Sequence, residues 1–210
     1  MTIALAVGLT AATLCAVLAR IKSGRPPGGD FSGAEFYQIW YMLHALRIGL
    51  DPYAAGCPLK PPCADAFQYH PLTAGLSVWP LGLLTPGRAC VAFVGVSAAL
   101  LAYALTRDGY TRVPMLLSWP FAVAASNGQW APLLVAASLL PGLEWLYASK
   151  PQLGLALFVS RPSWRAVLLG AEFLAISLLV LPGCPQEWIR SAMHSPYVRR
   201  ARCAGLGSRR

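Results

Sequence analysis

The sequence predicts an all-α fold, a polytopic bundle of transmembrane helices with about six crossings. Of the 210 residues, 56% are hydrophobic and only 12% are charged, and the mean hydropathy is +0.52. A soluble domain carries about a quarter charged residues, so this composition points away from water. In addition, several apolar runs approach the roughly 20 residues that a helix needs to cross a bilayer.

Three of the predicted crossings contain prolines, which a membrane helix tolerates where neighbouring helices or water satisfy the freed carbonyls. The first crossing along the chain lacks a basic segment before it, so we expect an uncleaved anchor rather than a signal peptide. Intramembrane carboxylates are costly, so Glu144 and Glu172 are candidates for a functional role. Residues 152–160 are too short to cross and are expected to be re-entrant or part of a loop. The predicted crossings are residues 2–19, 72–84, 89–106, 113–126, 130–148 and 166–181.

Residues 20–70 form a long first loop of different character. Asp30 follows a Pro- and Gly-rich stretch and stands where a helix N-cap belongs, before FSGAEFYQIWYMLHALRIG. This segment is rich in Trp and Tyr, which concentrate at membrane interfaces. We therefore expect an amphipathic helix lying in the interface plane, ended by Gly49 and followed by an Asx-type turn at Asp51.

The formal charge of +9 is concentrated at the C-terminus, in a basic tail at 185–210. A polybasic segment next to a crossing indicates a cytoplasmic end on anionic lipid. Nucleic-acid binding is the other interpretation, but no aromatic interleaving supports it, and we expect no nucleic-acid partner. Arg20, Lys22 and Arg25 would also be cytoplasmic by the positive-inside rule, whereas six crossings with a cytoplasmic tail place them outside. The charge evidence on orientation is divided.

Two cysteines, Cys57 and Cys63, lie in the segment CPLKPPC of the first loop. In an oxidising compartment they could close a small disulfide, and otherwise they are two unpaired thiols. The cysteines and histidines show no metal-binding spacing, so no metal site is expected.

Five short elements stand out along the chain. They are Asp30-Phe31, Gly49-Leu50-Asp51-Pro52-Tyr53, Phe67-Gln68-Tyr69-His70-Pro71-Leu72, Asn127-Gly128-Gln129 and Lys150-Pro151. In this order they make the chain resemble glycosyltransferase family 87 (DUF2029), which includes bacterial α-mannosyltransferases of the GT-C fold. The resemblance covers about residues 4–160. It implies a GT-C-like transmembrane domain at 1–184. Family members are about twice as long, so we expect a truncated or frame-shifted copy that retains the N-terminal half.

The resemblance implies a hexosyltransferase of the cell membrane, with its first loop extracytoplasmic. It would move a hexose, such as mannose, from a polyprenyl-phosphate donor to a hydroxyl of a lipid or glycan, without a cofactor. Such a transfer needs a base at the acceptor hydroxyl and positive charge at the leaving phosphate. The resemblance assigns Asp30 to the first role and Lys150 to the second. The structural alternatives are that Asp30 only caps a helix and that Lys150 reaches lipid headgroups.

The same elements nominate six residues that line the substrate site. Several have a plainer interpretation: Asp51 makes a turn, and His70 is simply interfacial. By the six-crossing count, the segment at 127–129 lies opposite Asp30, so it either closes a helix hairpin or the count is off by one. The rival function is a non-catalytic membrane protein whose partners are lipids: an inactive relative, a transporter-like bundle or a lipid-binding bundle. The nominated residues are Asp51, Tyr53, Tyr69, His70, Asn127 and Gln129.

Overall fold

The computed structural model describes residues 34–53 and 70–194, with six isolated helical positions between residues 6 and 17. Every regular element in this part of the chain is helical, which confirms the all-α prediction. The elements are α2 (Ala34–Arg47), α3 (Leu72–Ser77), η2 (Trp79–Leu83), α4 (Pro86–Thr106), η3 (Val113–Leu117), α5 (Trp119–Ser126), α6 (Ala131–Leu139), η4 (Glu144–Ser149), α7 (Pro151–Ser160), α8 (Trp164–Val180) and α9 (Cys184–His194).

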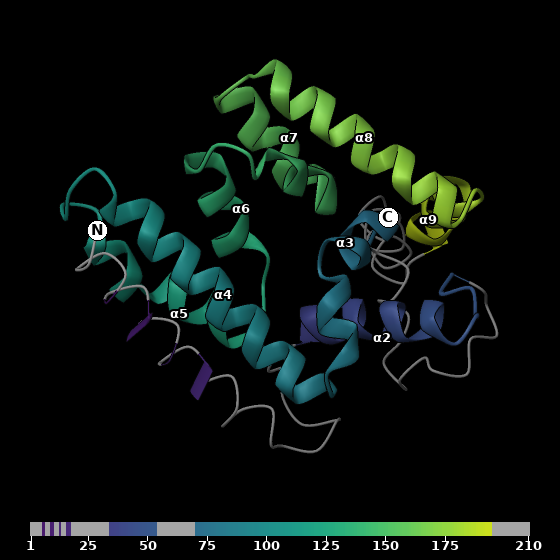
Figure 1. The fold of residues 1–210 in the computed structure, drawn as a ribbon, viewed down its shortest axis with the longest axis horizontal. Coiled ribbons are helices and arrows are strands. Elements are labelled where there is room, and N and C mark those ends of the chain that lie inside the picture. The colour runs from purple at the N-terminus through teal and green to yellow at the C-terminus, as the bar shows by residue number, and fades with distance from the viewer. Residues whose placement is uncertain are drawn as a thin grey trace, which may run out of the picture.

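The two longest helices, α4 and α8, lie on opposite sides of the molecule with shorter helices between them (Figure 1). The first half of α4 packs against α2, where the rings of Phe36 and Phe93 stack at 4.8 Å. Its second half packs against α6, where Leu101 and Leu105 share a buried cluster with Ala136. At 1.5 Å per residue, α4 is about 30 Å long. One end of the molecule therefore contains α2 and the start of α4. The other end, about 30 Å away, contains the last residues of α4 and α6.

One described helix, α4, is long and apolar enough to cross a membrane alone, with a mean hydropathy of 2.0 over its best window. The α8–α9 pair meets the same criteria only when taken together, and it is bent by 93°. The predicted crossings at 113–126 and 130–148 are each divided, into η3 and α5 and into α6 and η4. The number of crossings therefore stays a prediction.

Prolines account for these divisions. Pro114, Pro120 and Pro132 each stand in the first turn of a short helix, and Pro141 lies in the turn between α6 and η4. Proline fits the first turn because its missing N–H would have no partner there, but it breaks a helix interior. Pro120 therefore separates α5 from η3, and the turn at Pro141 separates η4 from α6, so neither predicted crossing is one continuous helix.

Helix α2 confirms the helix expected after Asp30, and Gly49 follows its end as predicted. The Leu50 N–H donates to the Ala45 carbonyl and the Gly49 N–H to that of Leu46, with Gly49 at a φ of +77°. This pair of hydrogen bonds is a Schellman motif, which favours glycine at the position with positive φ.

The expected position of α2 at the membrane surface needs correction. Its apolar residues are buried by α3, α4 and η2, and they include Phe36, Ile39, Met42, Leu43 and Ala45. Phe36, Ile39, Met42 and Leu43 lie on one face of the helix, and that face is buried against the protein, so it is not available to lipid. Helix α2 is thus part of the core.

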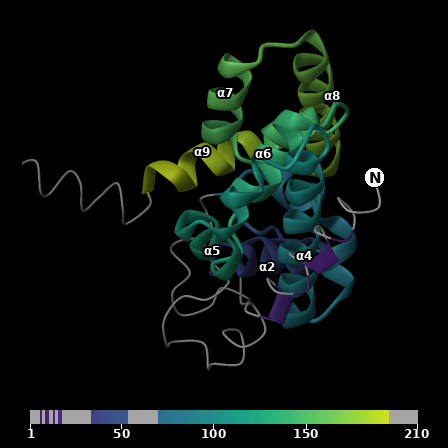
Figure 2. The same cartoon turned by 90° about the vertical axis from the view of Figure 1, so that its left-hand side faces the viewer.

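The last part of the described chain contains α7 and α8, which a short turn joins, and α9, which turns away from α8 (Figure 2). The segment expected to be re-entrant or a loop forms α7. The Ser163 hydroxyl accepts a hydrogen bond from the Ala166 N–H and caps α8. The predicted basic tail at 185–210 begins within α9, and residues 195–210 lie outside the described residues.

Candidate functional site

An ion pair joins two distant parts of the chain. Lys150, the residue before α7, donates from Nζ to Oε1 of Glu35 in the first turn of α2. The two side chains are only 21% and 17% exposed. Water screens such a pair less than it screens a surface pair. The pair brings the Lys150-Pro151 element to the helix that follows Asp30 in the sequence.

His70 lies beside this pair. Its Nε2 is 3.1 Å from Oε1 of Gln38, which is one helical turn beyond Glu35 and on the same face of α2. Burial, together with the positive charge of Lys150, lowers the pKa of His70 to about 3. The imidazole is therefore neutral at pH 7 and donates from Nε2 to the Gln38 amide oxygen. We call Glu35, Gln38, His70 and Lys150 the polar cluster.

Asp51 and Tyr53 are not members of the polar cluster, but they fix the position of His70 through hydrogen bonds. The Asp51 carboxylate accepts from the Tyr53 N–H at 2.9 Å, which is the predicted Asx turn. The Tyr53 hydroxyl donates to the His70 carbonyl at 3.0 Å, and burial raises the Tyr53 pKa above its usual range. Tyr53 is 3% exposed, so it positions His70 and is not an open wall of a substrate site.

Next to the polar cluster, a side-chain hydrogen bond joins α3 to η4. The Thr73 hydroxyl donates to the Ala148 carbonyl at 2.6 Å. The adjacent Ser149 hydroxyl is fully buried and has no hydrogen-bond partner within the part of the chain that the structure describes. The Thr73–Ala148 hydrogen bond holds together the two backbone segments that carry His70 and Lys150.

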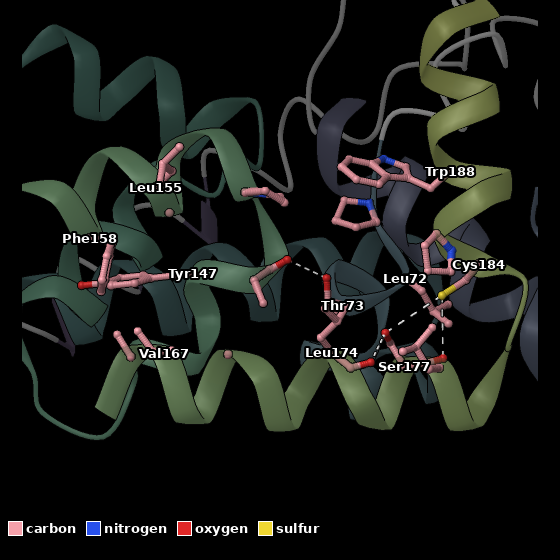
Figure 3. Close-up of a pocket in the computed structure, with 18 of the residues that line it drawn as sticks. Leu72, Thr73, Tyr147, Leu155, Phe158, Val167, Leu174, Ser177, Cys184 and Trp188 are labelled. Carbon is pink, nitrogen blue, oxygen red and sulfur yellow. Dashed lines mark hydrogen bonds between the residues drawn. The ribbon is translucent and has the colours of Figure 1, made fainter. Parts of the chain in front are cut away.

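An apolar groove of about 610 Å³ adjoins the polar cluster. Helix α8 forms one side, η4 and α7 form another, and α9 lies at one end (Figure 3). Figure 3 shows Phe158 and Tyr147 near one end, and Cys184 and Trp188 near the other. Pro71 and Pro151 both line the groove, and each directly follows a residue of the polar cluster. The four members of the polar cluster are not among the residues that line the groove, so the two are linked through these chain neighbours.

Asn127 and Gln129 lie in the turn that joins α5 to α6, so the segment closes a helix hairpin. The next residue, Trp130, is fully buried, and its ring lies 5.2 Å from that of Phe93. Phe93 in turn stacks on Phe36, beside Glu35. The turn therefore faces the α2 end of the molecule, and its two polar residues are not members of the polar cluster.

Four of the nominated residues lie outside the described residues: Asp30, Tyr69, Cys57 and Cys63. The structure brings together Lys150 and His70, with Asp51 and Tyr53 behind them. Sequence reasoning did not nominate Glu35 or Gln38. The sequence nevertheless contains a pattern that could have identified them, because they are two polar residues three positions apart on a helix that is otherwise largely apolar. The groove had no such signal, since its walls come from α3, η4, α7, α8 and α9.

Comparison of the chain with family models, with curated proteins and with solved structures finds no match.

Proposed function

We propose that the protein is a membrane hexosyltransferase of the GT-C type, which takes a hexose from a polyprenyl-phosphate donor. The observation that supports this most is the junction of the polar cluster with the groove. At both His70-Pro71 and Lys150-Pro151, the first residue belongs to the cluster and the proline lines the groove. A ligand with a phosphate head and a long apolar chain fits such a junction.

The groove suits the lipid part of this donor. Its walls are almost wholly apolar, and on α8 they extend from Ala166 to Leu178. Twelve helical steps at 1.5 Å give a length of about 18 Å along α8. Small residues keep the space open, because a Cβ on Gly170 would meet no atom within 4 Å. A branched hydrocarbon chain could lie there without displacing the helix.

In the proposed reaction, Lys150 stabilises the leaving phosphate and Asp30 is the base. The acceptor oxygen forms a bond to the anomeric carbon of the sugar. The bond from that carbon to the phosphate oxygen breaks, and its electron pair stays on the phosphate. The hydroxyl proton of the acceptor passes to Asp30. A positive charge near the departing oxygen lowers the barrier because negative charge develops there.

The charge distribution supports an orientation with the polar cluster toward the outer face. Arg161 donates to the Ser138 carbonyl at 3.0 Å and so joins the end of α7 to the end of α6. The turns at this end hold four arginines against two carboxylates: Arg107, Arg112, Arg161 and Arg165 against Asp108 and Glu144. The cluster end carries a smaller excess of positive charge, with Arg47, Arg88 and Lys150 against Glu35 and Asp51. The positive-inside rule therefore favours a cytoplasmic location for the end with the four arginines.

This orientation conflicts with a cytoplasmic C-terminal tail. Cys184, the first residue of α9, packs with Tyr53 and Leu72, at the same end as the polar cluster. We give more weight to the arginines in the turns, because charges in short loops beside helix ends dominate orientation.

The test is transfer of radiolabel from a polyprenyl-phosphate mannose to membrane lipid, with wild type compared with Asp30→Asn. We expect the variant to lose transfer at least a hundredfold, since removal of a general base costs about that much. Asp108→Asn is the matched control, because this carboxylate is exposed in the turn after α4. Equal transfer by wild type and Asp30→Asn, or none by either, contradicts the proposal.

A second candidate is a lipid-phosphate binding protein without catalysis. The groove and the ion pair favour it, because neither needs Asp30 for binding. In that case wild type and Asp30→Asn both bind a polyprenyl phosphate and neither transfers sugar.

A further inference from the structure

Glu35 neutralises the charge of Lys150. The carboxylate contacts the ammonium group directly, and both side chains are largely shielded from water. The two other members of the polar cluster carry no charge at pH 7, because Gln38 is an amide and His70 is neutral. A phosphate that binds Lys150 therefore meets a cluster whose net charge is zero.

The reaction proposed above changes the charge of the lipid phosphate. The donor is a phosphodiester with one negative charge. Loss of the sugar leaves a phosphate monoester, which carries about 1.5 to 2 negative charges at pH 7 because its second pKa is about 6. Donor and product thus share one chain and one binding group but differ in charge by almost one unit.

The geometry points to Glu35 as the residue that distinguishes these two phosphates, because it offsets the stronger attraction that Lys150 would otherwise exert on the dianionic product and so eases its release. This inference rests on the proposed function. The Glu35 carboxylate stays close to any phosphate on Lys150, and its repulsion grows with the phosphate charge. One additional charge about 5 Å away, in surroundings of intermediate polarity, changes affinity by about tenfold or more.

A purely structural role for Glu35 would change the ligand affinities in a different way. If the carboxylate only fastened α2 to the start of α7, its loss would weaken the binding of all ligands by a similar factor. The ratio of two affinities, measured for ligands that differ only in charge, separates the two roles.

The probes are farnesyl phosphate, a monoester, and methyl farnesyl phosphate, its singly charged diester. Binding to the full chain in detergent is measured by titration calorimetry at pH 8, for wild type and three variants. We expect Glu35→Gln to tighten the monoester about tenfold more than the diester. Lys150→Gln should weaken both by tenfold or more. Glu187→Gln, which removes a half-buried carboxylate on α9 that is paired with Arg190 and does not line the groove, should change neither affinity.

The outcomes are distinct. If wild type binds both probes and Glu35→Gln leaves their affinity ratio unchanged, the inference about Glu35 is wrong while the proposed function stands. If wild type binds neither probe, the polyprenyl-phosphate donor is wrong, and the inference fails with it. If Glu35→Gln lowers the thermal midpoint but shifts the ratio as expected, the inference is supported in spite of the lost ion pair.

Discussion

Gly154 of α7 lies directly against the backbone of Tyr147 in η4. A Cβ at this position would be 2.8 Å from the Tyr147 carbonyl carbon and would overlap its oxygen. Neither group is the end of a flexible side chain, so only a shift of one helix could relieve the contact. The absence of a side chain at residue 154 therefore sets the distance between η4 and α7, which together form one wall of the groove.

Gly154→Ala should destabilise the protein by about 1–3 kcal/mol, the usual cost of forcing an extra group into a packed contact. The measurement is thermal unfolding in detergent. Gly87→Ala in the first turn of α4 is the control, because a Cβ there meets nothing within 4 Å. It should be neutral or slightly stabilising, since alanine favours helix over glycine. A Gly154→Ala protein as stable as wild type would contradict the close contact.

Gly170→Leu should fill the groove without unfolding the protein. The Cβ of residue 170 has open space around it, and the residue lines the groove. We expect binding of farnesyl phosphate to weaken tenfold or more, because the leucine side chain occupies the volume of the lipid. Gly87→Leu gives the same change of residue type outside the groove and should bind as wild type does. Equal binding by both variants would place the lipid elsewhere.

Stability should fall as the pH is lowered from 7 toward 4. His70 has a pKa of about 3 in the folded protein and 6.5 when unfolded. Between these values the unfolded chain binds the additional proton, so acid favours unfolding. The slope is at most about 1.4 kcal/mol per pH unit from this one group. Unfolding midpoints of wild type and His70→Gln across this range test it, and the variant should show the flatter dependence. Parallel curves would count against a buried neutral imidazole.

Glu35 and Lys150 should be energetically coupled. Lys150→Met leaves a shielded carboxylate without its partner, and loss of one partner of a buried pair costs about 3–5 kcal/mol. Partial exposure reduces this to about 2 kcal/mol. The double variant with Glu35→Gln should recover much of the loss, which gives a coupling free energy of about 1–2 kcal/mol in a double-mutant cycle. Strict additivity of the two changes would mean that the contact contributes nothing.

The proposed orientation predicts which side of a membrane each end of the molecule faces. Ile48, after α2, and Tyr110, after α4, are 52% and 51% exposed. In a cysteine-free background, Ile48→Cys should react with an impermeant maleimide in intact cells, whereas Tyr110→Cys should react only after permeabilisation. The opposite pattern would reverse the orientation and leave the fold unchanged.

The sequence predicted local features of the fold well. Gly49 ends α2 through a bond pattern that favours a residue at positive φ, and Asp51 makes the turn that its side chain favours. Both features depend on a few neighbouring residues. The division of the crossings was missed because a hydropathy average does not register where a proline stands within a turn, although proline at a first turn starts a helix.

The candidate site was predicted in part. His70 and Lys150 could be nominated because short elements mark them, and the structure places them beside each other. Their partner Glu35 could not be inferred, since the pairing joins positions 115 residues apart and depends on how α2, α3 and η4 pack. The groove likewise exists only as the space between five elements.

The separation between Glu35 and Lys150 also bears on how the protein is made. A ribosome extends a chain by about 5–20 residues each second. Helix α2 is therefore synthesised several seconds or more before its basic partner emerges. During that interval the carboxylate of residue 35 has no Lys150 to neutralise it. The two halves of the site can join only after Lys150 has been synthesised, so assembly of the centre is a late event in biogenesis.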